Sequence, residues 1–274
     1  MSNFLKRTFT ASLFVIVLIG CTLAGKYSLS ALFFFVTVIG LWEFYSLAEK
    51  NTDNHPQKIM GILLGAFIYI LIAAYSFNII PLKLFVAIVP LIFFVFISEL
   101  FFKKTFPFRN IAYTLLGPIY VAVPFSLINY IGINSGTKEY HPEYILGIYF
   151  ILWANDTGAF LVGSKIGKTK LLERVSPGKT WEGSAGGALL GFIVTYIISI
   201  YFSDNSLKVL EWFVIGFILI VIGTMGDLVE SMLKRSKNVK DSGTLLPGHG
   251  GILDRFDSLI LSLPFIYFYL VLKG

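Results

Sequence analysis

Residues 226–257 read GDLVESMLKRSKNVKDSGTLLPGHGGILDRFD and form a charged window between two long apolar runs. Only 14% of the whole chain is charged, so the concentration of charge in this window needs a reason. Ionisable side chains at the edge of a membrane span are costly, and we therefore expect them to be functional. The charged residues of the window are Asp227, Glu230, Lys234, Arg235, Lys237, Lys240, Asp241, Asp254, Arg255 and Asp257.

The composition indicates a polytopic membrane protein. Mean hydropathy is +0.78, 56% of the residues are apolar and 27 are Phe, whereas a soluble domain is roughly 25% charged. The single Cys21 excludes a disulfide within the chain and a zinc site built on cysteines. Leu18–Cys21 resembles a lipoprotein cleavage box, but we interpret the first apolar run as an anchor, because eight more spans follow it.

Nine apolar runs are long enough to cross a hydrocarbon core. The sequence therefore predicts an all-α integral membrane protein of about nine transmembrane helices. With the N-terminus in the cytoplasm, 17 of the 22 basic residues fall on the cytoplasmic side, which is the bias typical of membrane proteins. The predicted runs are 8–25, 27–47, 59–76, 83–102, 111–131, 144–163, 184–202, 209–228 and 257–272.

Residues 1–140 are predicted to be a membrane scaffold and an oligomer interface, and residues 141–274 to be the catalytic membrane domain. Glu43 and Glu99 are the acids that lie in or beside the spans of the first part. We interpret both as packed or snorkelling carboxylates near an interface.

Asp156 lies near the middle of the sixth predicted span, within WANDTGAF at 153–160. A carboxylate there costs about 2.5–3.5 kcal/mol on insertion scales, which favours a role in a site over a packing pair with another span. The loop that follows contains two G-K-T sequences, but neither has P-loop spacing or follows a strand. Lys179, in SPGKTWEG at 176–183, is a candidate ligand because Pro and Gly fix the backbone around it.

Gly183, Gly187 and Gly191 recur every four residues at the start of the seventh span. Small residues at this spacing allow two membrane helices to approach closely. We interpret them as packing residues and not as ligands.

The charged window itself divides into a helix, a loop and a second helix. Asp227, Glu230, Ser231 and Lys234 share one face of a helix that continues out of the eighth span. Glu230 and Lys234 could be a solvated pair, whereas Asp227 has no basic residue within four positions. The glycine-rich residues 242–251 could cradle phosphates with backbone N–H groups.

Asp254 and Asp257 open the ninth span, where carboxylates could bind a hard cation whose other ligands are waters and phosphates. Acids on two helices, a glycine-rich loop and several basic residues suit phosphoryl or nucleotidyl transfer, which depends on positioning and charge stabilisation. His249 could act as a general base or as a hydrogen-bonding loop residue. We favour the second role, because a phosphomonoester nucleophile is already ionised near neutral pH.

These motifs resemble those of the phosphatidate cytidylyltransferase family, also called CDP-diacylglycerol synthases. The window looks like the family's full signature, and the WANDTGAF and SPGKTWEG blocks are similar to the family's, with Phe160 where many relatives carry Tyr. The signature positions are Ser231–Arg235, Lys240, Asp241, Gly243, Leu246, Pro247, His249–Ile252 and Asp254–Asp257.

The resemblance implies that CTP and phosphatidate react to give CDP-diacylglycerol and pyrophosphate. It also implies a nine-span homodimer in the cell inner membrane, with its active site in a polar cavity open to the cytoplasm, and no nucleic-acid partner. Asp227 and Asp254 would hold a divalent cation, usually Mg²⁺, and a second cation is possible. Lys234 and Arg235 would join the two acids as catalytic groups, and substrate would be bound by Asp156, Lys179, Ser231, Lys240, Asp241, His249, Gly250, Gly251, Arg255 and Asp257.

Three alternatives remain at this point. A CTP-dependent polyprenol or dolichol kinase would transfer the γ-phosphoryl group instead. A CDP-alcohol phosphotransferase fits less well, because its D-G-x-x-A-R pattern is absent. A transporter or scramblase would explain Asp156 and broken helices, but not the gathering of charge on one side.

Overall fold

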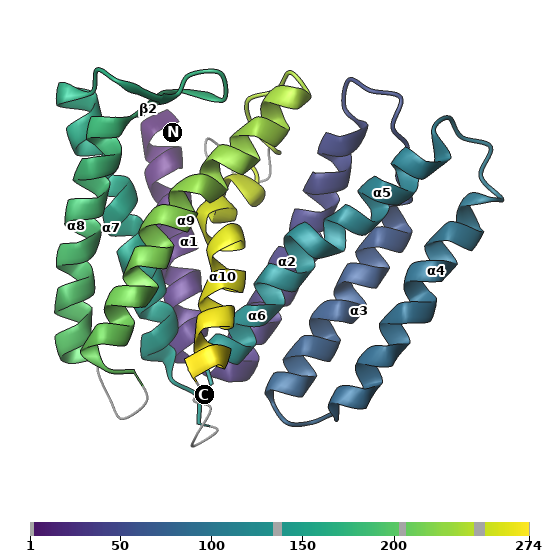
Figure 1. The fold of residues 1–274 in the computed structure, drawn as a ribbon, viewed down its shortest axis with the longest axis horizontal. Helices are drawn as coiled ribbons and strands as arrows, with labels where there is room; N and C mark the ends of the chain where they lie inside the picture. The colour runs from purple at the N-terminus through teal and green to yellow at the C-terminus, as the bar shows by residue number, and fades with distance from the viewer. Residues whose placement is uncertain (1–2, 134–138, 203–206, 244–249, 274) are drawn as a thin grey trace. The chain divides into compact units, whose positions relative to one another are not determined.

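The computed structural model describes residues 3–133, 139–202, 207–243 and 250–273 (Figure 1). Long helices dominate the chain, and one short antiparallel strand pair interrupts them. The elements in chain order are α1 (Asn3–Leu23), α2 (Lys26–Glu49), α3 (Lys58–Ser76), η1 (Leu82–Ala87), α4 (Ile88–Glu99), α5 (Pro107–Gly117), η2 (Pro118–Ala122), α6 (Val123–Ile131), α7 (Pro142–Ile166), β1 (Lys170–Leu172), β2 (Ser176–Thr180), α8 (Trp181–Tyr201), α9 (Val209–Ser236) and α10 (Leu253–Lys273).

Eight segments in the described part of the chain are helical, apolar and long enough to cross a membrane. Five are the single helices α2, α3, α7, α8 and α9, and a sixth is α10. The other two are composite, η1 with α4 and α5 with η2 and α6. The described apolar part of α1, Thr8–Leu23, falls below that length. The prediction of an all-helical polytopic membrane protein is confirmed.

Prolines account for the irregular parts of the composite spans. Pro81 precedes the 3₁₀ turn η1, and Pro118 begins the π-helical segment η2. A proline lacks the N–H of a regular helix, and such breaks in membrane helices are tolerated where neighbouring groups compensate.

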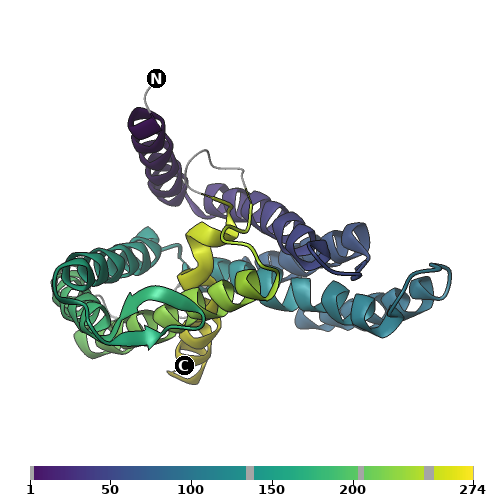
Figure 2. The same ribbon diagram turned by 90° about the horizontal axis from the view of Figure 1, so that it is seen from above.

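The helices and loops group into two compact units. The first unit contains Met1–Tyr130 and Ser236–Arg255, and the second contains Ile131–Arg235 and Phe256–Gly274. The described residues between α9 and the start of α10 thus pack with the N-terminal helices, although most of α9 and α10 belongs to the second unit. Figure 2 shows the same helices from above.

The first unit is built around α2, α3 and α5. An apolar cluster of Leu64, Ile68, Val95 and Ile111 joins α3, α4 and α5. The hydroxyl of the fully buried Tyr45 donates to the Thr114 carbonyl at 2.6 Å, so α2 is fixed against α5.

Glu99 ends α4 as a buried carboxylate within a network of side-chain amides. Gln57 Nε2 donates to one of its oxygens at 2.6 Å, and Asn110 Nδ2 donates to the other at 3.0 Å. Glu99 is therefore a packed carboxylate that links three helix ends, and it does not snorkel.

Close packing of α7 on α8 organises the second unit. A Cβ at Gly187 would lie 2.7 Å from the Asn155 carbonyl oxygen, and one at Gly191 would lie 3.0 Å from Ile220. A Cβ at Gly183 would lie 3.0 Å from the Ala159 carbonyl oxygen. The prediction that these glycines pack helices is confirmed.

Candidate functional site

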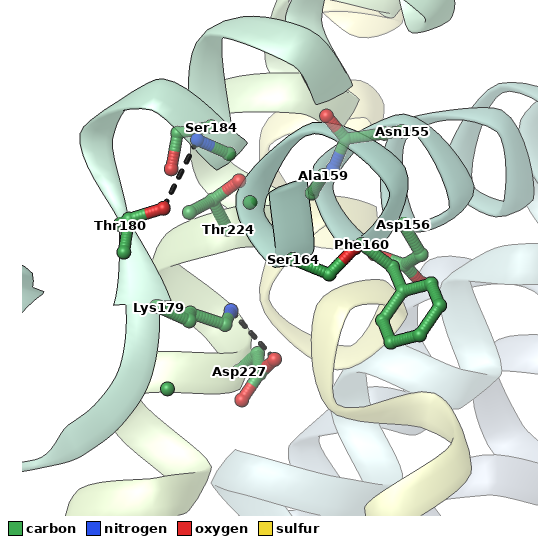
Figure 3. A pocket seen from close by; sticks show the side chains of 13 residues that line it. Asn155, Asp156, Ala159, Phe160, Ser164, Lys179, Thr180, Ser184, Thr224 and Asp227 are labelled. Carbon is green, nitrogen blue, oxygen red and sulfur yellow. Dashed lines mark hydrogen bonds and ion pairs between the residues drawn. The ribbon is translucent and has the colours of Figure 1, made fainter. Parts of the chain in front are cut away.

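A cavity of about 490 Å³ lies within the second unit, among α7, β2, α8 and α9 (Figure 3). This volume falls within the range of about 300–1,000 Å³ that small-molecule sites occupy. Its walls combine small residues with a few charged and hydroxyl groups. The lining residues are Asn155, Asp156, Ala159, Phe160, Gly163, Ser164, Gly178, Lys179, Thr180, Gly183, Ser184, Thr224 and Asp227.

An ion pair between Lys179 and Asp227 crosses this cavity. The Lys179 Nζ lies 2.5 Å from Asp227 Oδ2, and the two side chains are 28% and 31% exposed. Ser231 Oγ, one turn along α9, donates to Asp227 Oδ1 at 3.2 Å. Asp227 has no basic neighbour in sequence, and its cation comes from the strand β2, 48 positions earlier in the numbering.

A β-hairpin positions Lys179, in a segment that the sequence predicts to be a loop. β1 pairs antiparallel with β2, with Lys170 opposite Thr180. Thr180 then caps α8, because its hydroxyl accepts the Gly183 N–H at 3.1 Å. The Glu182 carboxylate accepts the N–H groups of Lys168 and Thr169, each at 3.1 Å. These bonds tie the hairpin to the start of α8 and direct Lys179 into the cavity.

Asp156 and Asp257 add acidic groups to the second unit. Asp156 is an exposed residue of α7 that lines the same cavity (Figure 3). Asp257 lies beside α9 at Gly226, where a Cβ would come within 2.5 Å of the Asp257 carbonyl oxygen. This close approach lets α10 pack on α9 next to Asp227.

Lys234 forms an ion pair with Glu230 on α9, and the pair is buried. The Lys234 side chain is 11% exposed and that of Glu230 is fully buried. The interpretation of this pair as solvated is therefore wrong: α9 continues as a helix to Ser236, and the face that carries both residues turns inward. Arg235, the next residue, is exposed.

Asp254 lies in the first turn of α10, within the first unit, and its carboxylate accepts hydrogen bonds from the loop before the helix. Asp254 Oδ2 accepts the Ser242 N–H at 2.9 Å, the Ser242 hydroxyl at 2.9 Å and the Gly251 N–H at 2.8 Å. Gly250 has a positive φ of 82°, and a Cβ there would lie 2.6 Å from Asp254 Oδ2. Glycine is thus required where the backbone passes the carboxylate.

The remaining predicted site residues lie along the same segment. Lys240, Asp241 and Arg255 are exposed. His249 lies outside the described residues. Asp227 belongs to the second unit and Asp254 to the first, so their meeting at one cation stays a prediction.

Glu43 contacts the loop before Asp254, a contact that the sequence did not predict. It is buried on α2, and its two carboxylate oxygens accept the Ile252 N–H at 2.9 Å and the Leu253 N–H at 3.0 Å. The expectation of a snorkelling carboxylate is wrong for Glu43, whereas that of a packed one is confirmed. The available signal was an acid inside an apolar run, which is costly unless it has a partner.

The part of the chain that the structure describes holds no preformed metal cage. Among the residues that the structure describes, three or more His, Cys, Asp or Glu side chains nowhere gather as metal ligands. Mg²⁺, however, is usually held by one or two carboxylates together with waters and substrate phosphates. A carboxylate that lines the cavity, such as that of Asp227, fits a cation of that kind.

Comparison with known proteins agrees with these features. The model of the cytidylyltransferase family matches residues 5–273. The chain is 34% identical to phosphatidate cytidylyltransferase of Bacillus subtilis over 99% of both chains. It is 35% identical to that of Staphylococcus aureus and 32% identical to that of Staphylococcus haemolyticus, in each case over 97% of this chain and 98% of the relative. The chain therefore belongs to the phosphatidate cytidylyltransferase family, as its motifs predicted.

Proposed function

We propose that this protein transfers the cytidylyl group of CTP to phosphatidate, forming CDP-diacylglycerol and pyrophosphate. One observation carries the proposal: the Lys179–Asp227 pair lies in a cavity of nucleotide-compatible size. Lys179 lies in the SPGKTWEG block, and Asp227 lies four residues before the signature that begins at Ser231. In such a pair the ammonium can bind a phosphate while the carboxylate binds a cation. The full-length similarity to phosphatidate cytidylyltransferases supports the choice of substrates.

The reaction needs no general base from the protein. A phosphatidate oxygen, already ionised near neutral pH, attacks the α-phosphorus of CTP. A new P–O bond forms there, the bond from that phosphorus to the oxygen bridging to the β-phosphorus breaks, and pyrophosphate leaves with the bonding electrons. The protein's contribution is to align the two phosphates and to neutralise their charge.

Each charged group then has a proposed role. Lys179 exchanges its contact with Asp227 for one with a phosphate oxygen, and Asp156 lines the path beside it. Arg235 and Lys240, both exposed, contact the lipid phosphate. The other predicted contacts to substrate come from Ser231, Lys234, Asp241, His249, Gly250, Gly251, Arg255 and Asp257.

Magnesium is the proposed cofactor, with Asp227 and Asp254 as its protein ligands. When bound, the ion would neutralise charge on the triphosphate and favour the departure of pyrophosphate. The donor set supports this assignment, because carboxylate and phosphate oxygens are the ligands that Mg²⁺ prefers. A second cation is compatible with the same set of acids.

We further propose that the N-terminus and the site face the cytoplasm of the cell membrane, which the distribution of basic residues favours. The chain would act there as a homodimer, as the family resemblance implies. The molecular mass of the protein in detergent, measured by light scattering, tests the dimer.

Product analysis tests the reaction. Purified protein is incubated with phosphatidate, Mg²⁺ and CTP labelled at either the α- or the γ-phosphate, with samples lacking phosphatidate as controls. We expect the α-label in the lipid and the γ-label in pyrophosphate. Release of CDP with the γ-label in the lipid would identify a kinase and overturn the proposal. Nucleotide-independent flux of lipid or solute through vesicles, without either product, would identify a transporter or scramblase.

A further inference from the structure

Glu43 joins the N-terminal helices to the loop that leads into Asp254, in the first turn of α10. It lies on α2, 209 and 210 positions before Ile252 and Leu253, and its side chain is buried with 6% exposure. Its carboxylate accepts two consecutive backbone N–H groups at the start of α10, those of Ile252 and Leu253. We propose that Glu43 is a positioning residue of the active site, which holds this loop so that Asp254 is presented for catalysis. The inference rests on the function proposed above.

The geometry requires a carboxylate in particular. One oxygen accepts the Ile252 N–H and the other accepts the Leu253 N–H, so both oxygens must be acceptors. Glutamine would place its NH₂ group against one of these donors. Aspartate would fall short by one C–C bond, about 1.5 Å. A negative charge at this point also faces the N-terminus of α10, where the helix dipole favours it.

Ser242 couples Glu43 to Asp254. Its hydroxyl lies 3.2 Å from Glu43 Oε2 and 2.9 Å from Asp254 Oδ2. A hydroxyl has one hydrogen, so it can donate to only one of these oxygens at a time. The two carboxylates therefore share one donor, and a change at Glu43 alters the bonding available to Asp254.

Two glycines of the loop lie against the Glu43 carboxylate. A Cβ at Gly243 would lie 2.6 Å from Glu43 Oε1, and a Cβ at Gly251 would lie 2.4 Å from Glu43 Oε2. Any larger residue would push the carboxylate away. These glycines thus leave space for the Glu43 side chain. The N–H groups of residues 251–253 donate to the carboxylates of Glu43 and Asp254.

Lys237 links the other end of the loop to the same helix, α2. Its Nζ donates to the Ala48 carbonyl at 3.1 Å, in the last turn of α2, and lies 4.9 Å from the centre of the Tyr113 ring. Asn51 Nδ2 donates to the Lys237 carbonyl at 2.8 Å. Both ends of the loop are therefore held on α2, and Glu43 holds the end that continues into Asp254.

The test compares Glu43→Gln with Glu43→Asp and with a matched control, Glu49→Gln, which makes the same change near the end of the same helix. Hydrogen exchange is measured on peptides covering residues 239–255, in protein without substrates. Steady-state rates are then measured as functions of CTP and of Mg²⁺. For Glu43→Gln we expect at least tenfold faster exchange in these peptides, at least a tenfold loss of kcat/KM for CTP and at least a threefold rise in half-saturating Mg²⁺.

Glu43→Asp should lie between the wild type and Glu43→Gln, and Glu49→Gln should match the wild type. Exchange of α3 and α5 peptides, which belong to the same unit as Glu43, reports whether the variant has kept its fold. If Glu43→Gln does not fold, Ser242→Ala replaces it, and we expect faster exchange of the same peptides with a higher Mg²⁺ requirement. For whichever variant is used, hydrogen exchange in the loop at the wild-type rate would overturn the proposal. Faster exchange together with wild-type kinetics and wild-type Mg²⁺ dependence would also overturn it. If the wild type made no CDP-lipid, the proposed function would fail, whereas the exchange data would still report on the Glu43 anchor.

Discussion

Replacing Asp227 by Asn separates the catalytic role of this carboxylate from its structural one. Asn has nearly the same shape and can still accept the hydrogen bond that the Ser231 hydroxyl donates to Asp227 Oδ1 at 3.2 Å. It removes the negative charge opposite Lys179 and, in the proposed site, one oxygen ligand of the cation. The two consequences have different magnitudes, and each can be measured.

The structural cost should be small. The Lys179–Asp227 pair is about one-third exposed, and ion pairs that solvent reaches contribute about 0–1 kcal/mol to stability. The catalytic cost should be much larger, because the loss of one group that stabilises developing charge lowers turnover by about 100- to 1,000-fold. We therefore expect Asp227→Asn to be a folded and nearly inactive protein.

The assay follows pyrophosphate release in detergent with CTP, phosphatidate and a range of Mg²⁺ concentrations, alongside thermal unfolding. Asp53→Asn, the same change at an exposed acid outside the predicted site, serves as the control and should behave as the wild type. Near-normal turnover of Asp227→Asn at limiting Mg²⁺ would refute the role of this carboxylate. Equal losses of stability and activity would show that the residue acts only through the fold.

Three further results are expected. Lys234→Met should lower the free energy of unfolding by about 3–5 kcal/mol, because it removes the ammonium that pairs with the buried Glu230 carboxylate, and the double change with Glu230→Gln should recover much of that stability in denaturation assays. Gly187→Ala should destabilise the protein by about 1–3 kcal/mol through overpacking against α7, whereas Gly20→Ala, which meets nothing within 4 Å, should not. In a chain without its native cysteine, Arg174→Cys in the hairpin should react with an impermeant thiol reagent in inverted vesicles and not in intact cells, and the opposite result would reverse the proposed orientation.

The membrane helices could be predicted from sequence because a span needs only length and low polarity. Helix packing at Gly183, Gly187 and Gly191 could also be predicted, since the spacing of small residues is a local pattern. The family could be predicted from the signature between 231 and 257, which is contiguous.

Features that depend on contacts between distant segments could not be predicted from sequence in the same way. The basic segment before α8 has no strand-like alternation, and its hairpin is fixed by Glu182 accepting N–H groups from residues 14 and 13 positions earlier. The Glu230–Lys234 spacing suits an exposed helical pair equally well, and burial of that face is decided by packing. Glu43 finds its partners 209 and 210 positions away, so sequence could indicate that it needs partners but not which ones.

Exposure separates the charged pairs of this protein into two kinds. The Lys179–Asp227 pair is about one-third exposed and lines a cavity, so breaking it costs about 0–1 kcal/mol. The Glu230–Lys234 pair is buried, and removing one partner of such a pair costs about 3–5 kcal/mol. A group that must release its partner to bind a phosphate in every turnover needs the first kind of pair. Lys179 is therefore the ammonium that we expect to contact the triphosphate, and the buried Glu230–Lys234 pair is expected to contribute more to the stability of α9.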